Sequence, residues 1–313
     1  MNKILFIRSD RLGEFLLTLP AIQMVKANYP QAKTYLLAAR DNVELIRDWP
    51  QVDYFWEYKS SFESFKGALR LAEAIRREKI DCVVVFNPKK IFHAAAFLAD
   101  AKIRAGYNHK WGFCLNRRLK DRRDLGLKHD VEHNIELAAA LCPNVFIPSL
   151  ELPVDPPQVL DFLKPDLGLL KKYVVIHAFT SNPNKKLPCE FWQALTKRLK
   201  KSGLTNIVLI GADAEIEESQ ALAQQLKAND LCGKLKVREL AAFLKYNCRL
   251  FVGLDSGPMH LAAALSLPTI GLFTISNPVR WKPFTKTGLA VKVQSSQDWS
   301  QAIEKIALFA QEH

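Results

Sequence analysis

The stretch that decides the fold runs from residue 251 to 264 and reads Phe-Val-Gly-Leu-Asp-Ser-Gly-Pro-Met-His-Leu-Ala-Ala-Ala. Its first residues form a continuous apolar run, which is typical of a parallel strand buried on both faces. Ser256 and Gly257 then predict a tight turn, and Pro258 suits the first position of a helix. The stretch therefore predicts a strand that ends near Asp255, a turn, and a short helix over 259–265.

The same alternation extends through the second half of the chain. Hydrophobic periodicity predicts strands at 173–178, 206–211, 249–254 and 269–273, and helices at 191–202, 215–228 and 237–246. The final segment places Trp299, Ile303, Ile306 and Ala310 at helical spacing. We expect this last helix to bury its apolar face, with the first half of the chain as one candidate partner.

The first half of the chain shows the same pattern. Strands are predicted at 3–8, 35–38 and 82–86, and helices at 14–28, 62–78 and 91–99. Between the halves prolines cluster at 143, 148, 153, 156, 157 and 165, which favours a linker. Strands alternating with helices predict parallel sheets. The predicted fold is therefore α/β, with two Rossmann-like domains at 1–155 and 156–313.

Composition limits the class of protein. The chain has 313 residues, 49% of them hydrophobic and 24% charged, which excludes wholesale disorder and a fibrous repeat. No apolar run approaches the ~20 residues that span a bilayer, and the first residues lack the pattern of a signal peptide. The six cysteines lie far apart with no C-x-x-C pair, which argues against a zinc site or a disulfide framework. We expect a cytoplasmic protein with reduced thiols.

The net charge of +12 indicates an anionic partner. The charge is densest between Lys102 and Lys128, which contains nine basic residues against Asp121 and Asp124. A solvated surface explains such a stretch equally well. No zinc finger, RNP motif or basic zipper accompanies it, so no nucleic-acid partner is expected.

Polar residues follow several predicted strands, where open parallel sheets bind their ligands. The turn at Asp255, Ser256 and Gly257 predicts an anion cradle at a helix N-terminus, with His260 one turn into the helix. The other three loops add hydroxyl, cationic and acidic groups, namely Glu14 after the first strand, Thr180, Ser181, Lys185 and Lys186 after the strand at 173–178, and Glu215 after the strand at 206–211. With a single glycine, the first loop supports a dinucleotide fingerprint only weakly. Each group also has a structural explanation: Glu14 can complement a helix dipole, and His260 can be a buried hydrogen-bonding residue.

Several of these motifs resemble the bacterial lipopolysaccharide heptosyltransferases, glycosyltransferase family nine. Gly253-Leu-Asp-Ser-Gly-Pro-Met-His-Leu-Ala-Ala-Ala-Leu265 is similar to the family's hallmark D-S-G-P-M-H-L-A-A-A. The opening segment from Ile7 to Pro20 is similar to the family's first loop and helix. The resemblance covers both halves. It implies a GT-B fold, with the two parallel sheets facing across a cleft, an N-terminal acceptor-binding domain and a C-terminal donor-binding domain.

The resemblance also implies an activity. Family members transfer a sugar with inversion, usually from ADP-heptose, to an acidic acceptor glycan on lipid A of the Kdo type. This implies a nucleotide-sugar co-substrate, no cofactor and no metal, and peripheral contact with the cytoplasmic face of the inner membrane. Basic residues that would meet the acidic acceptor are Arg11, Arg117, Arg118 and Lys120.

Site roles carry over from the family residue by residue. The general base corresponds to Glu14 and the phosphate-binding lysine to Lys185, with Lys186 as the neighbouring option. The phosphate-binding hydroxyls correspond to Thr180 and Ser181, and the carboxylate that binds the ribose corresponds to Glu215. The turn that contacts the donor corresponds to Asp255, Ser256 and Gly257, with His260 as a further donor contact. Two positions depart from the family pattern, because Glu14 replaces the usual Asp and Thr274 the usual Gly.

Three other functions fit the same residues. A nucleotide-sugar epimerase on this scaffold would convert its donor without an acceptor. A non-catalytic basic protein would bind nucleotides or nucleic acid, with strongly salt-dependent affinity for duplex DNA. A family member that has lost activity is also compatible with the Glu14 departure.

Overall fold

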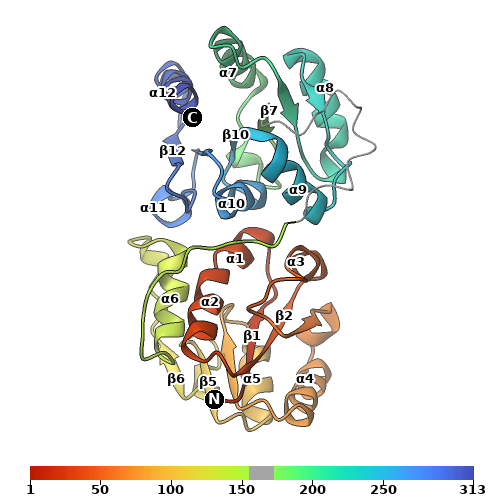
Figure 1. The fold of residues 1–313 in the computed structure, drawn as a ribbon, viewed down its shortest axis with the longest axis vertical. Coiled ribbons are helices and arrows are strands. Elements are labelled where there is room, and N and C mark those ends of the chain that lie inside the picture. Colours follow the sequence, from red (N-terminus) through yellow and green to blue (C-terminus); the bar gives the residue numbers. More distant parts are fainter. Residues whose placement is uncertain (155–172) are drawn as a thin grey trace. The chain divides into compact units, whose positions relative to one another are not determined.

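The chain folds into two compact units, Met1–Pro153 and Val154–His313. The computed structural model describes residues 1–154 and 173–313 (Figure 1). Residues 143–153 contain no helix or strand, as the proline cluster predicts. Pro156, Pro157 and Pro165, which belong to the same predicted linker, lie outside the described residues.

The first unit contains a six-stranded parallel sheet in the order β3-β2-β1-β4-β5-β6. Its strands are β1 (Lys3–Arg8), β2 (Lys33–Ala38), β3 (Tyr54–Glu57), β4 (Cys82–Val85), β5 (Ile103–Tyr107) and β6 (Arg117–Leu119). Its helices are α1 (Leu12–Leu16), α2 (Leu19–Asn28), α3 (Arg40–Leu45), α4 (Phe65–Arg77), α5 (Lys90–Leu98) and α6 (Asp130–Ala139). On one face, apolar side chains of α4 and α5 pack against β1, β2 and β4 in a continuous core. Helices α2 and α6 pack together.

The second unit contains another six-stranded parallel sheet, in the order β12-β11-β10-β7-β8-β9. Its strands are β7 (Tyr173–His177), β8 (Ile207–Leu209), β9 (Asn229–Asp230), β10 (Cys248–Leu254), β11 (Thr269–Phe273) and β12 (Gly288–Lys292). Its helices are α7 (Cys189–Lys201), α8 (Ile216–Leu226), α9 (Val237–Asn247), α10 (Gly257–Ala264), α11 (Pro278–Trp281) and α12 (Trp299–Glu312). Counted from its own first strand, this sheet repeats the strand order of the first.

The predicted helix over 14–28 is wrong in one respect, because it is divided into α1 and α2. Pro20 lacks an N–H group and its ring excludes the carbonyl four residues earlier, so an uninterrupted helix cannot pass through it. The Leu17 carbonyl, released at the break, accepts a hydrogen bond of 2.9 Å from the Asn134 side chain. The break keeps Glu14 on a short helix of its own, close to the end of β1.

Other differences lie in short or polar elements. The helix predicted over 259–265 begins earlier, at Gly257, because its first turn requires no N–H from Pro258. The basic stretch at 102–128 contains β5 and β6, which were not predicted, and β3, α6 and β12 were also missed. Helix α12 buries Ile303, Ile306 and neighbouring apolar residues in the core of the second unit against α7, so docking on the first half is not needed to cover them.

No helix among residues 1–154 and 173–313 is long and apolar enough to cross a membrane.

Candidate functional site

Both sheets reverse their strand order at one place, and this is where open α/β sheets bind ligands. In the first unit the reversal lies between β1 and β4, and in the second between β7 and β10. The loops that leave the carboxyl ends of these strands contain Glu14 in the first unit, and Thr180, Ser181, Lys185 and Asp255 in the second. The topology therefore concentrates most of the predicted site residues at the two reversal points.

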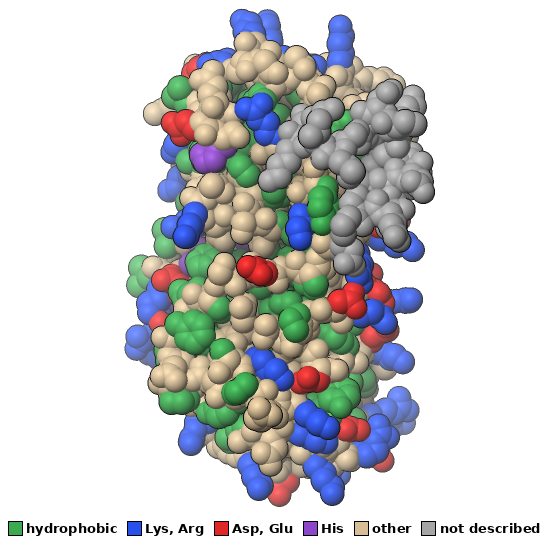
Figure 2. All heavy atoms as spheres, in the orientation of Figure 1, with side chains coloured by type: hydrophobic (Ala, Val, Ile, Leu, Met, Phe, Trp, Pro, Cys, Tyr) green, Lys and Arg blue, Asp and Glu red, His purple; other side chains and the backbone are tan. Residues whose placement is uncertain are grey.

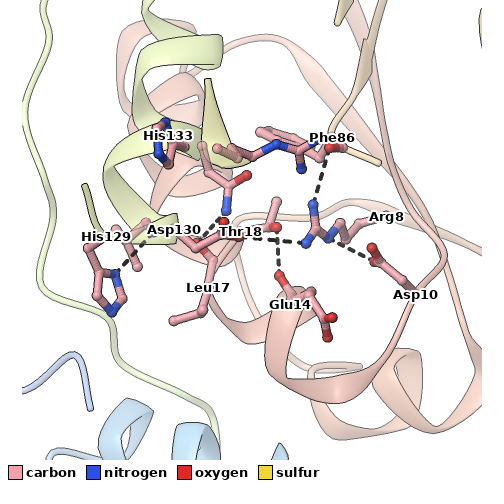
Figure 3. Close-up of polar contacts among 12 residues, drawn as sticks. Arg8, Asp10, Glu14, Leu17, Thr18, Phe86, His129, Asp130 and His133 are labelled. Atoms are coloured by element: carbon pink, nitrogen blue, oxygen red, sulfur yellow. Dashed lines mark hydrogen bonds and ion pairs between the residues drawn. The ribbon is translucent and has the colours of Figure 1, made fainter. Parts of the chain in front are cut away.

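A buried arginine organises the loop after β1 (Figure 3). Arg8 is only 1% exposed. Its guanidinium pairs with Asp10 at 2.8 Å, donates to the Phe86 carbonyl at 3.2 Å, and lies 3.9 Å from Asp130 at the start of α6. A buried charge is costly unless it is paired, so Arg8 ties β1, β4 and α6 together at this edge. The sequence analysis assigned no role to Arg8, although a charged residue at the end of an apolar strand indicates a buried ion pair or a functional group.

Glu14 lies in the first turn of α1, half-buried, with its carboxylate directed away from the arginine network (Figure 3). Its backbone carbonyl accepts a 2.9 Å hydrogen bond from the Thr18 hydroxyl. Among the described residues, none binds the Glu14 carboxylate itself. Asp10, the other carboxylate of the loop, is engaged by Arg8. Of the two carboxylates in this loop, the one on Glu14 is therefore the one available to accept a proton.

The four predicted acceptor-binding cations do not form one cluster. Arg11 precedes α1, whereas Arg117 and Arg118 lie on the edge strand β6 and Lys120 directly follows it. All four are exposed. Three strand spacings separate β1 from β6, which amounts to about 14 Å. The cations therefore line a broad edge of the first sheet, and Figure 2 shows Lys and Arg side chains spread over the face in view.

In the second unit, a lysine, an aspartate and a histidine meet beside the N-terminus of α10. The Lys185 ammonium group binds the Asp255 carboxylate at 2.7 Å and lies 3.4 Å from the Asp255 carbonyl. The second carboxylate oxygen of Asp255 lies 3.7 Å from Nε2 of His260, which is buried. Burial raises the pKa of Asp255, but hydrogen bonds and charges from His260 and Lys185 outweigh this effect and lower the pKa to about 2. Asp255 is thus ionised and holds the lysine at the turn.

The turn itself leaves backbone donors available. Ser256 precedes α10 without capping it, because its hydroxyl donates to the Leu254 carbonyl and contacts the His177 ring, each at 3.0 Å. In any α-helix the first amide groups lack a partner within the helix. Here they belong to Gly257 and Met259, since Pro258 has no N–H. An unfilled helix N-terminus beside a lysine suits an anion.

The structure distinguishes the two neighbouring lysines, whereas the sequence did not decide which of them binds phosphate. Lys185 binds Asp255, whereas Lys186 is exposed and pairs with Glu218 on α8 at 2.7 Å. Thr180 accepts a 3.2 Å hydrogen bond from the amide of Asn182 and shapes the loop, while Ser181 is exposed. Lys185 is therefore the lysine that faces the turn.

Thr274, which departs from the pattern of the family that the sequence resembles, also contacts this loop. Its hydroxyl donates to the Lys185 carbonyl at 3.4 Å. A cavity of about 340 Å³ opens beside it, at the carboxyl ends of β11 and β12. Its lining residues are Phe273, Thr274, Ile275, Ser276, Asn277, Pro278, Lys292 and Gln294. The departure at Thr274 thus adds a link between the lysine loop and the wall of this cavity.

Glu215 and His177 complete the arrangement. Glu215 belongs to a 3-10 turn that follows β8, and its carboxylate accepts the amide of Ala212 at 2.8 Å. One oxygen of this carboxylate lies 3.9 Å from Nε2 of His177. His177 is the last residue of β7, and burial lowers its pKa to about 4, so the ring is neutral. Sequence reasoning quoted His177 within its loop but gave it no function.

Replacing Asp255 tests the electrostatics of the turn. The folded-state pKa of about 2 lies below the ordinary value of 3.8, so ionised Asp255 stabilises the fold fully above about pH 4 and loses this effect as pH falls towards 2. We expect Asp255→Asn to lower the free energy of unfolding by about 2 kcal/mol at pH 7, and by roughly half as much at pH 3. Urea denaturation at both pH values measures the difference. Asp124→Asn, at an exposed site, controls for loss of one negative charge at pH 7, and an equal effect of the two variants there would contradict the prediction.

Comparisons with known proteins show the family of this chain. A model of glycosyltransferase family 9 (heptosyltransferase) matches residues 68–307. A Haemophilus influenzae relative with a provisional glycosyltransferase name is 30% identical over 304 residues, covering 90% of this chain and 86% of the relative. Lipopolysaccharide heptosyltransferase 3 of Escherichia coli K12 is 24% identical over 286 residues, covering 88% of this chain and 83% of that protein.

Among solved structures, Escherichia coli heptosyltransferase WaaC with ADP-2-deoxy-2-fluoro heptose superposes with a TM-score of 0.73 at 20% identity. The match covers 97% of this chain and 98% of WaaC. The two parallel six-stranded sheets are therefore those of a GT-B-like fold, as predicted. Together with the family match over most of the chain, this identifies the protein as a member of glycosyltransferase family 9, the heptosyltransferase family.

Proposed function

We propose that the protein transfers a heptose from ADP-heptose to an acidic acceptor of the lipopolysaccharide-core type, with inversion and without a metal ion. The observation that carries this proposal is the Lys185–Asp255 pair beside the free N-terminus of α10. The WaaC complex with a fluorinated ADP-heptose and the names of the lipopolysaccharide heptosyltransferases support the choice of donor and acceptor. In this proposal the first unit binds the acceptor and the second the donor.

Departure of the nucleotide requires positive charge on its diphosphate. Lys185 supplies a cation, and the amides of Gly257 and Met259 supply aligned N–H donors that need no rearrangement during the reaction. Removing one such donor from an active site typically costs about 3 kcal/mol of transition-state stabilisation. This combination can neutralise the leaving group, which is the reason for proposing a metal-independent reaction.

The acceptor hydroxyl must lose its proton as its oxygen attacks the anomeric carbon. Glu14 takes this proton, a new C–O bond forms, and the bond to the diphosphate breaks with its electrons leaving on ADP. Attack opposite the leaving group inverts the configuration at the anomeric carbon. Glu14 suits the role because its carboxylate has no partner among the described residues, and its extra methylene relative to Asp lengthens the reach by about one bond.

The acceptor and the membrane surface are proposed to meet the basic edge of the first unit at the cytoplasmic face of the inner membrane. Arg117, Arg118 and Lys120 provide positive charge for an acidic glycan and for anionic lipid. Two exposed aromatic residues lie in the loop between β5 and β6, Trp111 at 42% and Phe113 at 70% exposure, with ring centroids 6.4 Å apart. Aromatic side chains beside cations are typical of proteins that lie at a bilayer interface.

Glu14→Gln tests the base. The amide cannot take a proton, so we expect product formation from ADP-heptose and a Kdo–lipid A acceptor to fall by about 10²- to 10⁴-fold. The dissociation constant for ADP, measured by calorimetry, should stay within about twofold because Glu14 belongs to the other unit. Glu44→Gln, a surface carboxylate of the same unit, should leave both unchanged. Retained turnover in Glu14→Gln would eliminate the assignment.

The two adjacent lysines form a matched pair of variants. We expect Lys185→Met to weaken ADP binding or slow turnover by about 100-fold in total, since it removes the cation at the turn. Lys186→Met should have little effect, because its partner is the exposed Glu218. Calorimetry with ADP and steady-state kinetics measure both variants. Equal losses in the two, or a larger loss in Lys186→Met, would contradict the geometry.

Membrane contact can be tested with vesicles. We expect the wild-type protein to sediment with vesicles that contain 30 mol% anionic lipid far more than with purely zwitterionic vesicles, and raised salt should weaken the binding. Replacing Trp111 and Phe113 together with Ser should reduce this binding several-fold. Leu308→Ser, at a 58% exposed site on α12, provides the control. Equal binding to anionic and zwitterionic vesicles, or unchanged binding after Trp111 and Phe113 are both replaced with Ser, would contradict the proposal.

A further inference from the structure

Helix α6 contacts the segment between β1 and α2 at two points. Asp130, the first residue of α6, lies 3.9 Å from the guanidinium of Arg8 at the end of β1 (Figure 3). One helical turn further on, the Asn134 side chain donates to the carbonyl of Leu17, just beyond the end of α1. Residues four positions apart lie on the same face of a helix, and Asp130 and Asn134 are both fully buried. One face of α6 therefore holds this segment at its beginning and at its end.

The break between α1 and α2 removes two helical hydrogen bonds. In an uninterrupted helix the amide of Ala21 would donate to the Leu17 carbonyl, but here it donates to the Thr18 carbonyl at 3.0 Å. The Glu14 carbonyl loses the amide of Thr18 in the same way. The Asn134 side chain takes over the Leu17 carbonyl. The Thr18 hydroxyl takes over the carbonyl of Glu14, and each of these two replacement bonds is 2.9 Å long.

The replacement bond explains why a buried asparagine stands at position 134. The Oδ1 atom of Asn134 is buried and has no hydrogen-bond partner in the part of the chain that the structure describes. Such an oxygen costs free energy, which an apolar side chain of similar size would avoid. Because the group that it contacts on Leu17 is a carbonyl, only the amide nitrogen of Asn134 can make the bond. The need for an N–H donor at the break therefore accounts for the asparagine.

The position of the Glu14 carboxylate depends on α1. Across residues 1–154 and 173–313 no side chain binds this carboxylate, so the backbone of α1 determines where it projects. Helix α1 has only five residues, far fewer than the ~12 that a helix needs to be stable by itself. Its end is held by Asn134, and its Glu14 carbonyl is held by Thr18. Loss of either bond frees the end of α1 and displaces the carboxylate.

We propose that Asn134 and Thr18 are positioning residues for proton transfer by Glu14. They act through backbone carbonyls of the segment that contains Glu14, and not by contact with a substrate. The inference rests on the proposed function, in which Glu14 is the base, and adds to it that α6 sets the position of this base through Asn134.

A double-mutant cycle between Asn134 and Glu14 tests the proposal. Asn134→Leu has a side chain of similar size that cannot donate, and we expect turnover of ADP-heptose with a Kdo–lipid A acceptor to fall by about 10- to 100-fold. In the Glu14→Gln background the same change should lower the residual turnover by less than about twofold, because no base remains to be positioned. Single-turnover assays measure all four proteins. A merely structural role would lower turnover by the same factor in both backgrounds.

A matched control separates this effect from the loss of any side-chain hydrogen bond. Asn116 precedes β6, at the edge of the first sheet opposite to Glu14, and donates to the Lys102 carbonyl at 2.8 Å. Asn116→Leu also removes a bond from an amide to a backbone carbonyl, and it should leave turnover unchanged. The dissociation constant for ADP should stay within about twofold of the wild-type value in both leucine variants, because the donor is proposed to bind the other unit.

Thr18 provides a second test that does not depend on the folding of Asn134→Leu. Thr18→Val keeps the shape of the side chain but removes the hydroxyl from the Glu14 carbonyl. We expect turnover to fall about tenfold in the wild-type background and to stay unchanged in Glu14→Gln. Thr18→Ser keeps the hydroxyl and should retain most of the wild-type turnover. If Asn134→Leu does not fold, the Thr18 variants decide the case.

The outcomes distinguish failure of the proposed function from failure of the inference. If Glu14→Gln by itself keeps wild-type turnover, Glu14 is not the base and the inference fails with it. If Glu14→Gln loses turnover while Asn134→Leu and Thr18→Val stay as active as the wild type, the inference alone is overturned. Equal losses from these two changes in the wild-type and Glu14→Gln backgrounds would overturn it as well.

Discussion

A parallel strand buried on both faces has room for polar side chains only at its ends, and this constraint organises both units. Strands β1 and β7 are almost wholly apolar until their last residues, Arg8 and His177, which are both buried. Each must find partners there, because an unsatisfied buried polar group costs several kcal/mol. The residues that satisfy them, Asp10 for Arg8 and Ser256 for His177, come from loops at the same edge. The loops are thus shaped by the need to satisfy the strand ends.

The two units meet this constraint in different ways, and the difference matches the roles proposed for them. In the first unit the central group is a permanent cation that engages nearby carboxylates and leaves Glu14 out. In the second unit the central group is a neutral imidazole, and the charge lies one step away in the Lys185–Asp255 pair. In the proposed reaction, the first unit supplies the proton acceptor and the second supplies the turn that binds the diphosphate.

Internal pairing also fixes the position of Lys185 beside the N-terminus of α10. The ionised carboxylate of Asp255 holds the Lys185 ammonium group at the turn and so opposes its movement into solvent. The exposed pair between Lys186 and Glu218 is of the kind that contributes little, because water screens it. Two adjacent residues of the same type consequently differ in what they can do, and the difference arises from burial of the partner carboxylate.

The sequence by itself determined the fold class, most of the central strands and the loops that hold the site, because apolar runs and turn residues are local signals. It predicted β11 with its observed bounds and placed the turn at Asp255 correctly, and its resemblance to the heptosyltransferases agrees with the family match. Edge strands such as β3 and β6 were not predicted from the sequence, because they are short and half-exposed and show little periodicity. Only the tertiary structure distinguished Lys185 from Lys186 and brought His177 between Glu215 and Ser256. These outcomes depend on which strands are neighbours in a sheet, and residues separated by 38 and 79 positions meet only after the chain has folded.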